Sequence, residues 1–385
     1  MAATAGRRPE LADILAAHSP PPERLSRDRR RAIRDIVLCR TAMLGGHVQV
    51  CDSCGATKTV YHSCRNRHCP KCQSLDQARW VAAQARDLLP VPYFHLVFTV
   101  PTALHPLFFA DHRAGYQALF AAAMDAMSDV ARSRLGATPG VIAVLHTWTQ
   151  TMRFHPHLHC IVTGGGLSLD RARWIGTRPS FFLPVRVLSR VFRGKLLERF
   201  EAAVTSRSLS MSETFARQRL RQAASTPWVV YSKAPMAGPD QVLRYLSRYS
   251  HRVAIGNERI VAFHDGEVTF RYRDRRRGNR PDVLTLPATH FVQRFLLHTL
   301  PSRFVRIRHY GLLANGQRTR LVARARTRLG QPVAPQPVVA SIESWQALYQ
   351  RLTGRDPELC PVCHVGHIRT VYALVPAPAP SPRGP

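Results

Sequence analysis

The sequence has little negative charge. It contains 24 Asp and Glu residues against 55 Lys and Arg residues, a formal net charge of +31. Because such a surplus repels itself in a compact chain, it indicates an anionic partner: nucleic acid, acidic lipid or an acidic protein. The basic residues lie all along the sequence, which favours a nucleic-acid-facing surface. The alternative is the high-arginine composition of a GC-rich genome, since Ala, Arg and Pro are all abundant.

The sequence also lacks a long uninterrupted hydrophobic run. The most apolar window, residues 91–110, contains Pro92, Pro101 and Pro106, so it predicts a strand and a loop and not a membrane span. No charged segment followed by an apolar one opens the chain, so we expect no secretion signal and a cytoplasmic protein. No aromatic-rich motif of the kind that stacks single-stranded bases is present, which makes RNA a weaker candidate than DNA.

The chain has 385 residues with 45% hydrophobic content, enough for a sizeable core in one to three domains. Helical and strand-like segments are mixed along it, which predicts an α+β architecture. We expect a disordered arm over 1–24, a zinc-binding DNA-recognition domain over 25–85, a catalytic domain over 86–275, a C-terminal extension over 276–340, and a CxxC segment with a disordered Pro/Ala tail over 341–385.

Nine cysteines include three CxxC pairs, which in a chain without a secretion signal predict metal sites before disulfides. Two of the pairs can supply four thiolates to one structural zinc: Cys51, Cys54, Cys69 and Cys72. Three nearby residues stay open as alternative ligands or as part of a second site: Cys64, His62 and His68. Three basic residues of this zinc ribbon predict phosphate contacts: Arg65, Arg67 and Lys71. A structural zinc without any nucleic-acid contact is the alternative.

The third pair, Cys360 and Cys363, is followed by His364 and His367. One CxxC supplies only two thiolates, so a second zinc here would need His367 as a ligand. An unligated turn agrees with the sequence equally well.

A histidine-rich segment, residues 153–164, is expected to be a buried strand that ends at glycines. Because alternate side chains of a strand share a face, His157 and His159 point the same way, as does His155 if the strand begins early. Two imidazoles make half of a divalent-metal site, and hard phosphate oxygens as co-ligands favour Mg²⁺ or Mn²⁺. The third protein ligand stays open between His155, Gln241 and His251. A His-x-His pair that is only structural is the alternative.

Two tyrosines, Tyr245 and Tyr249, are one turn apart on a predicted helix over 239–249, so their hydroxyls share one face. A tyrosine hydroxyl becomes a competent nucleophile when a metal polarises the attacked phosphate. Three flanking arginines are expected to hold phosphates: Arg244, Arg248 and Arg252. Amphipathic packing, with both hydroxyls at the edge of the core, is the alternative.

These segments together resemble a known family. Residues 156–162 (Pro-His-Leu-His-Cys-Ile-Val) look like the HUH motif (His, hydrophobic, His) of single-strand DNA endonucleases, and residues 97–101 resemble that superfamily's first motif. Three further segments narrow the match: 64–73, 245–255 and 308–314. The set is similar to the two-tyrosine rolling-circle transposases of the insertion sequence 91 family.

The resemblance implies a metal-dependent bacterial, nucleoid-associated transposase that nicks one strand of DNA at an element end, forming a 5′-phosphotyrosine and a free 3′-OH. His157 and His159 carry over as metal ligands, Tyr245 and Tyr249 as nucleophile candidates, and the cysteines as a zinc-binding DNA-recognition module. Since the family also has single-tyrosine members, the essential tyrosine stays open. The implied fold is the HUH palm, an antiparallel sheet with packed helices, whose tyrosine helix crosses the metal.

Two other functions fit parts of the pattern. A replication initiator or plasmid relaxase shares the histidine strand and a tyrosine, but a zinc ribbon of this spacing points to the transposase. A non-catalytic zinc-ribbon protein that binds nucleic acid would use the same histidines and tyrosines for packing only.

Overall fold

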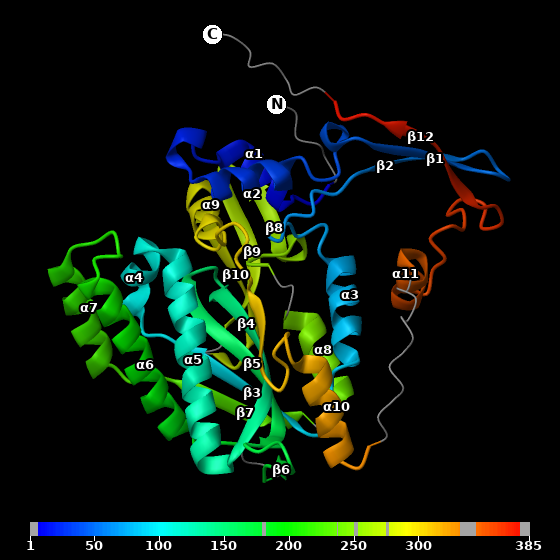
Figure 1. Cartoon of the computed structure of the whole chain (residues 1–385). Helices are drawn as coiled ribbons and strands as arrows, with labels where there is room; N and C mark the ends of the chain where they lie inside the picture. The colour runs from blue at the N-terminus through cyan, green and yellow to red at the C-terminus, as the bar shows by residue number, and fades with distance from the viewer. Residues whose placement is uncertain are drawn as a thin grey trace.

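The centre of the molecule is an antiparallel sheet in the order β11-β4-β5-β3-β7, with β6 paired to β5 (Figure 1). The structure, a computed structural model, describes residues 7–178, 182–236, 238–249, 253–274, 277–331 and 344–377, without the side chains at 234, 235, 248 and 249. The six strands are β3 (Tyr93–Thr99), β4 (Ala137–Trp148), β5 (Phe154–Ser168), β6 (Trp174–Gly176), β7 (Val230–Met236) and β11 (Ile307–Gly311). The strand expected within 91–110 and the histidine-rich strand expected within 153–164 are therefore confirmed as β3 and β5.

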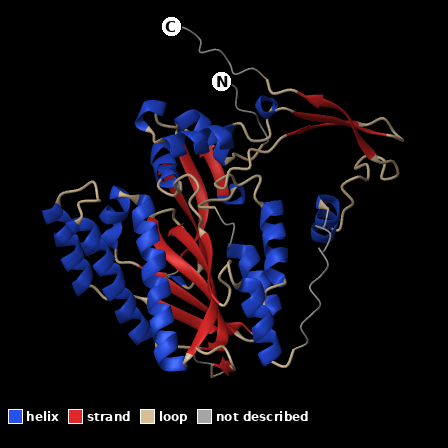
Figure 2. Cartoon of the chain, in the orientation of Figure 1, coloured by secondary structure: helices blue, strands red, loops and turns tan. Residues whose placement is uncertain are grey.

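Helices cover both faces of this sheet (Figure 2). On one face, alternate β5 residues such as Leu158 and Cys160 pack in a large apolar cluster with α4 (His105–Ala110), α5 (His112–Leu135), α6 (Val185–Thr205) and α7 (Glu213–Ser225). On the other face, Ile161 packs in a second cluster with α3 (Ser74–Ala85), α8 (Pro239–Tyr249) and α10 (Arg318–Arg328). The period-2 alternation of each strand thus sends its intervening residues, the histidines of β5 included, to the side of α8.

The helix α8 is anchored by the apolar stripe that its sequence predicts. Val242 and Leu246 are fully buried, and Leu243 is partly buried against the same cluster. These positions share one side of a helix, so their burial fixes which side faces the sheet. Tyr245 is next to Leu246 in the sequence and packs partly buried against the same cluster, so the burial of the stripe places Tyr245 against the sheet.

A second sheet, in the order β10-β9-β8, packs against three helices above the first sheet (Figure 1). Its elements are β8 (Ile260–His264), β9 (Glu267–Asp274), β10 (Arg280–Pro287), α1 (Leu11–His18), α2 (Arg27–Val37) and α9 (Ala288–Leu296). Leu11, Ile14 and Leu15 are fully buried in its core. The disordered arm expected over 1–24 is therefore wrong for 11–18, because an apolar stripe in this short polar stretch packs on distant residues.

A third, small sheet in the order β12-β1-β2 projects beside the N-terminal helices (Figure 1). It comprises β1 (Gly46–Cys51), β2 (Thr57–Tyr61) and β12 (Ile368–Leu374), and α11 (Trp345–Thr353) precedes β12. Short 3-10 turns lie at Pro22–Arg24, Ala42–Leu44, Thr102–Leu104 and Asn257–Arg259. Residues 332–343, at the end of the expected extension, and residues 378–385, in the expected Pro/Ala tail, lie outside the described residues.

The expected domain boundary at 275/276 does not separate two folding units. Strands β9 and β10 pair across it, and β11, placed in the extension, is an edge strand of the central sheet. The architecture is mixed helix and antiparallel sheet, as expected in outline. Among the described residues, no helix combines the length and the apolar character needed to cross a membrane.

Candidate active site and metal centres

Three histidines of the central sheet gather on the face that α8 covers. His146 of β4 lies directly opposite His157 of β5 in the strand register, and His159 follows two residues on. Their potential ligand nitrogens all lie within 4.8 Å of one another, and the Nε2 atoms of His157 and His159 are 3.1 Å apart. Two nitrogens about 2.1 Å from one ion stand about 3.0 Å apart in an octahedron, so the donor set fits a single divalent ion.

The backbone fixes the tautomer of one of these rings. Nδ1 of His157 lies 2.7 Å from the carbonyl oxygen of His155. A carbonyl only accepts, so Nδ1 must carry the proton, which leaves the Nε2 lone pair of His157 for an ion. The ring of His146 stacks on Trp148 at 4.8 Å, which holds that imidazole against the same site. These contacts orient the ligands before any ion binds.

The structure brings the two predicted ligands together and supplies a third that the sequence did not reveal. His155 is outside the group; the centroid of its ring lies 5.1 Å from that of His157 and 6.5 Å from that of His105. Gln241 is exposed on α8, and His251 lies outside the described residues. His146 was missed because only the pairing of β4 with β5, which the sequence does not give, places it opposite His157.

Tyr245 connects α8 to this histidine group. Its hydroxyl lies 3.0 Å from Nδ1 of His159 and 2.8 Å from Nε2 of His95, and those two nitrogens are 2.9 Å apart. If His159 binds an ion through Nε2, its proton is on Nδ1, so it donates to the phenolic oxygen. A metal ligand and the tyrosine hydroxyl thereby share one hydrogen bond.

His95, in β3, was also missed by the sequence reasoning. It is 4% exposed, and burial, with a smaller contribution from Lys233, lowers the pKa of its imidazole to about 4. A neutral ring at physiological pH can accept the phenolic proton at Nε2. The pairing of β3 with β5 places His95 opposite Ile161, on the face that carries His157 and His159, and the sequence does not give that pairing.

The second tyrosine and two of the arginines cannot be placed. The side chains of Arg248 and Tyr249, and all of Arg252, lie outside the described residues. Arg244 is exposed on α8. Tyr245 is thus the one predicted nucleophile whose contacts the described part of the chain includes.

Two of the three basic residues predicted for DNA contacts of the zinc module are occupied inside the protein. Arg67 donates to the carbonyl oxygen of Phe304, and burial lowers the pKa of its guanidinium. The ammonium of Lys71 lies 3.0 Å from a carboxylate oxygen of Glu10. Arg65 is exposed. Arg67 and Lys71 therefore tie the module to its neighbours, and only Arg65 is presented to solvent as predicted.

The cysteines form two groups instead of the expected set of Cys51, Cys54, Cys69 and Cys72. One group consists of Cys39, Cys64, Cys69 and Cys72; the other consists of Cys51, Cys54, Cys360 and Cys363. The predicted set is split because β1 carries the first CxxC away from the second. Cys39, at the end of α2, was not predicted, and Cys64 belongs to the first group. His68 is not in either group; its Nε2 accepts from the backbone N–H of Leu300.

The sulfur spacing in the first group suits a metal. The Sγ atoms of Cys64 and Cys72 are 3.7 Å apart. Four thiolates about 2.3 Å from a central zinc stand about 3.8 Å apart, whereas bonded sulfurs lie about 2.05 Å apart. The backbone N–H groups of Asn66 and Lys71 point at Cys64 and Cys69 over 3.4 Å, which favours thiolates.

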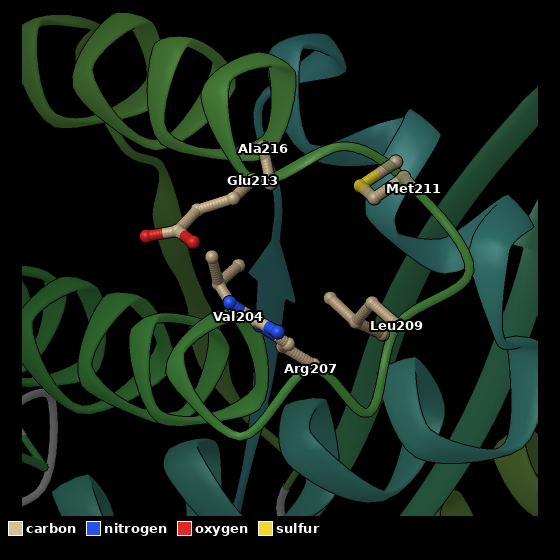
Figure 3. Close-up of a pocket in the computed structure, with 6 residues that line it drawn as sticks. All are labelled: Val204, Arg207, Leu209, Met211, Glu213 and Ala216. Carbon is tan, nitrogen blue, oxygen red and sulfur yellow. The ribbon is translucent and has the colours of Figure 1, made fainter.

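A separate pocket lies between the end of α6 and the start of α7 (Figure 3). Its lining is mainly apolar, with one arginine and one glutamate: Val204, Arg207, Leu209, Met211, Glu213 and Ala216. These helices pack on the sheet face opposite the histidines. The pocket is therefore not part of the histidine site.

Comparison with known proteins gives matches over most of the chain. A family model described as "Putative transposase" matches residues 140–320, and one described as "Transposase zinc-binding domain" matches residues 11–100. "Putative transposase y4qJ" of Sinorhizobium fredii (strain NBRC 101917 / NGR234) is 44% identical over 378 residues, covering 94% of this chain and 95% of that protein.

"Transposase for insertion sequence element IS801" of Pseudomonas savastanoi pv. phaseolicola is 28% identical over 299 residues, covering 74% of this chain and 70% of that protein. No solved structure matches. The two matched ranges contain the three histidines, Tyr245 and seven of the nine cysteines, whereas Cys360 and Cys363 lie outside both.

Proposed function

The chain belongs to the insertion sequence 91 family of transposases, and from that premise we propose that its histidine group and Tyr245 nick and rejoin single-stranded DNA at the ends of a rolling-circle element. The observation that carries the proposal is the hydrogen bond between the Tyr245 hydroxyl and His159, a member of the three-histidine group. It joins a candidate nucleophile to a candidate metal ligand.

The residues divide the work as follows. His146, His157 and His159 hold a divalent ion, Mg²⁺ or Mn²⁺, which when bound polarises the scissile phosphate and offsets the charge that develops on it. The oxygen of Tyr245 attacks phosphorus, the bond from phosphorus to the 3′ oxygen breaks, and the phenolic proton passes to Nε2 of His95. The products are a 5′-phosphotyrosine and a 3′-OH, whose oxygen takes up a proton.

The remaining parts bind DNA. We infer that the group of Cys39, Cys64, Cys69 and Cys72 holds a structural zinc in the N-terminal domain, and that exposed Arg65 and Arg244 contact phosphates. Tyr249 is the candidate for a second strand transfer. The proposed fold is the HUH palm. The transposase names of both relatives favour this function over a replication initiator or relaxase.

The test is a cleavage assay on labelled single-stranded DNA that carries the element ends, with Mg²⁺ or Mn²⁺, on a denaturing gel. We expect a metal-dependent protein–DNA adduct that Tyr245→Phe abolishes and Tyr349→Phe, a matched change in α11, leaves intact. The double variant His157→Ala/His159→Ala should also lose the adduct, whereas His264→Ala, at the exposed end of β8, should not. Tight DNA binding without an adduct on any end, in either metal, would instead indicate a non-catalytic binding protein.

A further inference from the structure

The second cysteine group joins two segments that are far apart in the sequence. Cys54 and Cys360, whose sulfurs approach within 3.7 Å, are separated by 306 positions. We propose that Cys51, Cys54, Cys360 and Cys363 bind a second zinc ion, which fastens the C-terminal strand β12 to the N-terminal hairpin of β1 and β2. This proposal does not depend on the nuclease function proposed above, because none of the four cysteines belongs to the histidine site.

The sulfur positions match a tetrahedral zinc site and not a disulfide. Sγ of Cys51 lies 3.7 Å from Sγ of Cys363, the same separation as between Cys54 and Cys360. All four sulfurs lie within 4.8 Å of one another. Thiolates bound to one zinc stand about 3.8 Å apart, whereas a disulfide requires about 2.05 Å. Each close pair takes one cysteine from each segment, so neither segment can complete the site alone.

Both turns direct backbone N–H groups at the sulfurs. Ser53 N lies 3.4 Å from Sγ of Cys51, Val362 N lies 3.4 Å from Sγ of Cys360, and Gly366 N lies 3.4 Å from Sγ of Cys363. Hydrogen bonds from amides favour the charged form of a sulfur, the form that binds zinc. The two turns are thus built alike, each as half of a thiolate site.

The two turns also fit closely against each other. A Cβ at Gly366 would lie 2.5 Å from Sγ of Cys51 and 2.4 Å from Cβ of Ser53, so a glycine is needed there. Asp52 N donates to the carbonyl oxygen of His367 over 3.0 Å, and His367 N donates to Oδ1 of Asp52 over 2.7 Å. His367, which the sequence analysis required as a ligand of any second zinc, contributes its backbone to this contact and is not in the cysteine group.

The small sheet has too little apolar core to hold β12 by itself. In β1 only Gly46, Val48 and Cys51 are buried, and no side chain of β2 or β12 is buried. Strand pairs without a buried face are marginal in water. A structural zinc supplies folding free energy directly, and small metal-binding domains unfold without it. The register of β12 on β1, from Gly46 opposite Leu374 to Cys51 opposite Ile368, therefore depends on the metal.

The test is the zinc content of the full-length protein, measured by elemental analysis after exhaustive dialysis. Two zinc ions per chain are expected in the wild type. The variant Cys360→Ala/Cys363→Ala should hold one zinc, and its β12 peptides should lose protection from hydrogen exchange. Cys160→Ala, which removes the one cysteine outside both groups, should hold two. Two zinc ions in the double variant, or one in the wild type, would overturn the proposal.

Two further measurements guard against a variant that simply fails to fold. Wild-type protein stripped of zinc and titrated with Co²⁺ should take up two equivalents with thiolate-to-cobalt absorption; saturation at one equivalent overturns the proposal. Gly366→Ala keeps every cysteine but crowds the site, so it should weaken the second equivalent at least about 10-fold and leave the first unchanged. Equal weakening of both equivalents would contradict a separate second site.

Discussion

The histidine site and the cysteine groups are both candidate metal centres, but they are held in opposite ways. The histidines lie on the adjacent strands β4 and β5, and β5 also carries residues such as Leu158 and Ile161 that are completely buried. Cys51, Cys54, Cys360 and Cys363 lie on turns at the end of a sheet with almost no core. Apolar packing is therefore expected to hold the histidine site without a metal, whereas on our proposal the site of Cys51, Cys54, Cys360 and Cys363 forms only with zinc.

Removing zinc should produce the largest contrast between the two regions. Structural zinc contributes on the order of 10 kcal/mol to small domains, so chelation at neutral pH should expose β1, β2 and β12 to full hydrogen exchange. Peptides from β3, β4 and β5 should keep their protection, because their packing needs no metal. Equal loss of protection in both regions would contradict the claim that only the small sheet depends on zinc for its structure.

Changing the histidines should produce the reverse effect, a loss of activity without a loss of fold. His146→Ala and His159→Ala are each expected to lower adduct formation by about 100-fold or more, since each removes a ligand of the ion that stabilises the developing charge. The thermal midpoint should change by only a few degrees, and His264→Ala serves as the control. If His155→Ala reduced the adduct as much as His146→Ala, the ligand set would be wrong.

A smaller effect is expected from His95, which contacts the tyrosine and not the ion. His95→Ala should reduce adduct formation by about 10- to 100-fold while the affinity for Mn²⁺ stays the same. Measuring both quantities on one preparation separates a role as acceptor of the phenolic proton from a role as metal ligand. A parallel fall in Mn²⁺ affinity would assign His95 to the metal site.

The packed half of the molecule should show the smallest effect, a moderate sensitivity to acid. His298 is 2% exposed, and burial lowers the pKa of its ring to about 4. Its Nε2 donates to the carbonyl oxygen of Met152 over 3.0 Å, and its Nδ1 lies 3.1 Å from the Thr147 hydroxyl. The ring is therefore neutral in the folded state.

Because the unfolded ring binds a proton near pH 6.5, the stability that depends on neutral His298 is complete above that pH and falls as the pH drops toward 4, by at most about 3 kcal/mol. Chemical denaturation between pH 7 and pH 4.5 measures this loss. His298→Gln should be less stable at pH 7 but show a flatter profile; an unchanged profile would point to other groups.

The sequence predicted well where one element carries the signal. The alternation of His157 and His159 and the helix over 239–249 are local patterns, and the structure contains both. It predicted poorly where distant segments meet. His146 and His95 join the site only through strand pairing, and Cys360 meets Cys54 across 306 positions. The pattern of apolar residues in one segment predicts which of its faces is buried, but not which residues of other segments pack against that face.

The helix α1 shows the same limit. A polar, Pro-rich composition predicted a disordered arm, yet Leu11, Ile14 and Leu15 fill a core made by β8, β9 and α9. Lys71, chosen for phosphate, instead pairs with Glu10 next to that helix. In both cases the prediction rested on local composition, whereas the contact that the segment or side chain makes depends on residues far away in the sequence.

The central claim is that His146, His157 and His159 hold a divalent ion beside Tyr245. The most direct test is an anomalous difference map from crystals of the protein grown with Mn²⁺ and a single-stranded DNA end. The account predicts one strong peak about 2.2 Å from a nitrogen of each of the three rings, with the phosphate between that ion and the Tyr245 hydroxyl. No peak at these rings at saturating Mn²⁺, or a peak bound by His155 in place of His146, would contradict it.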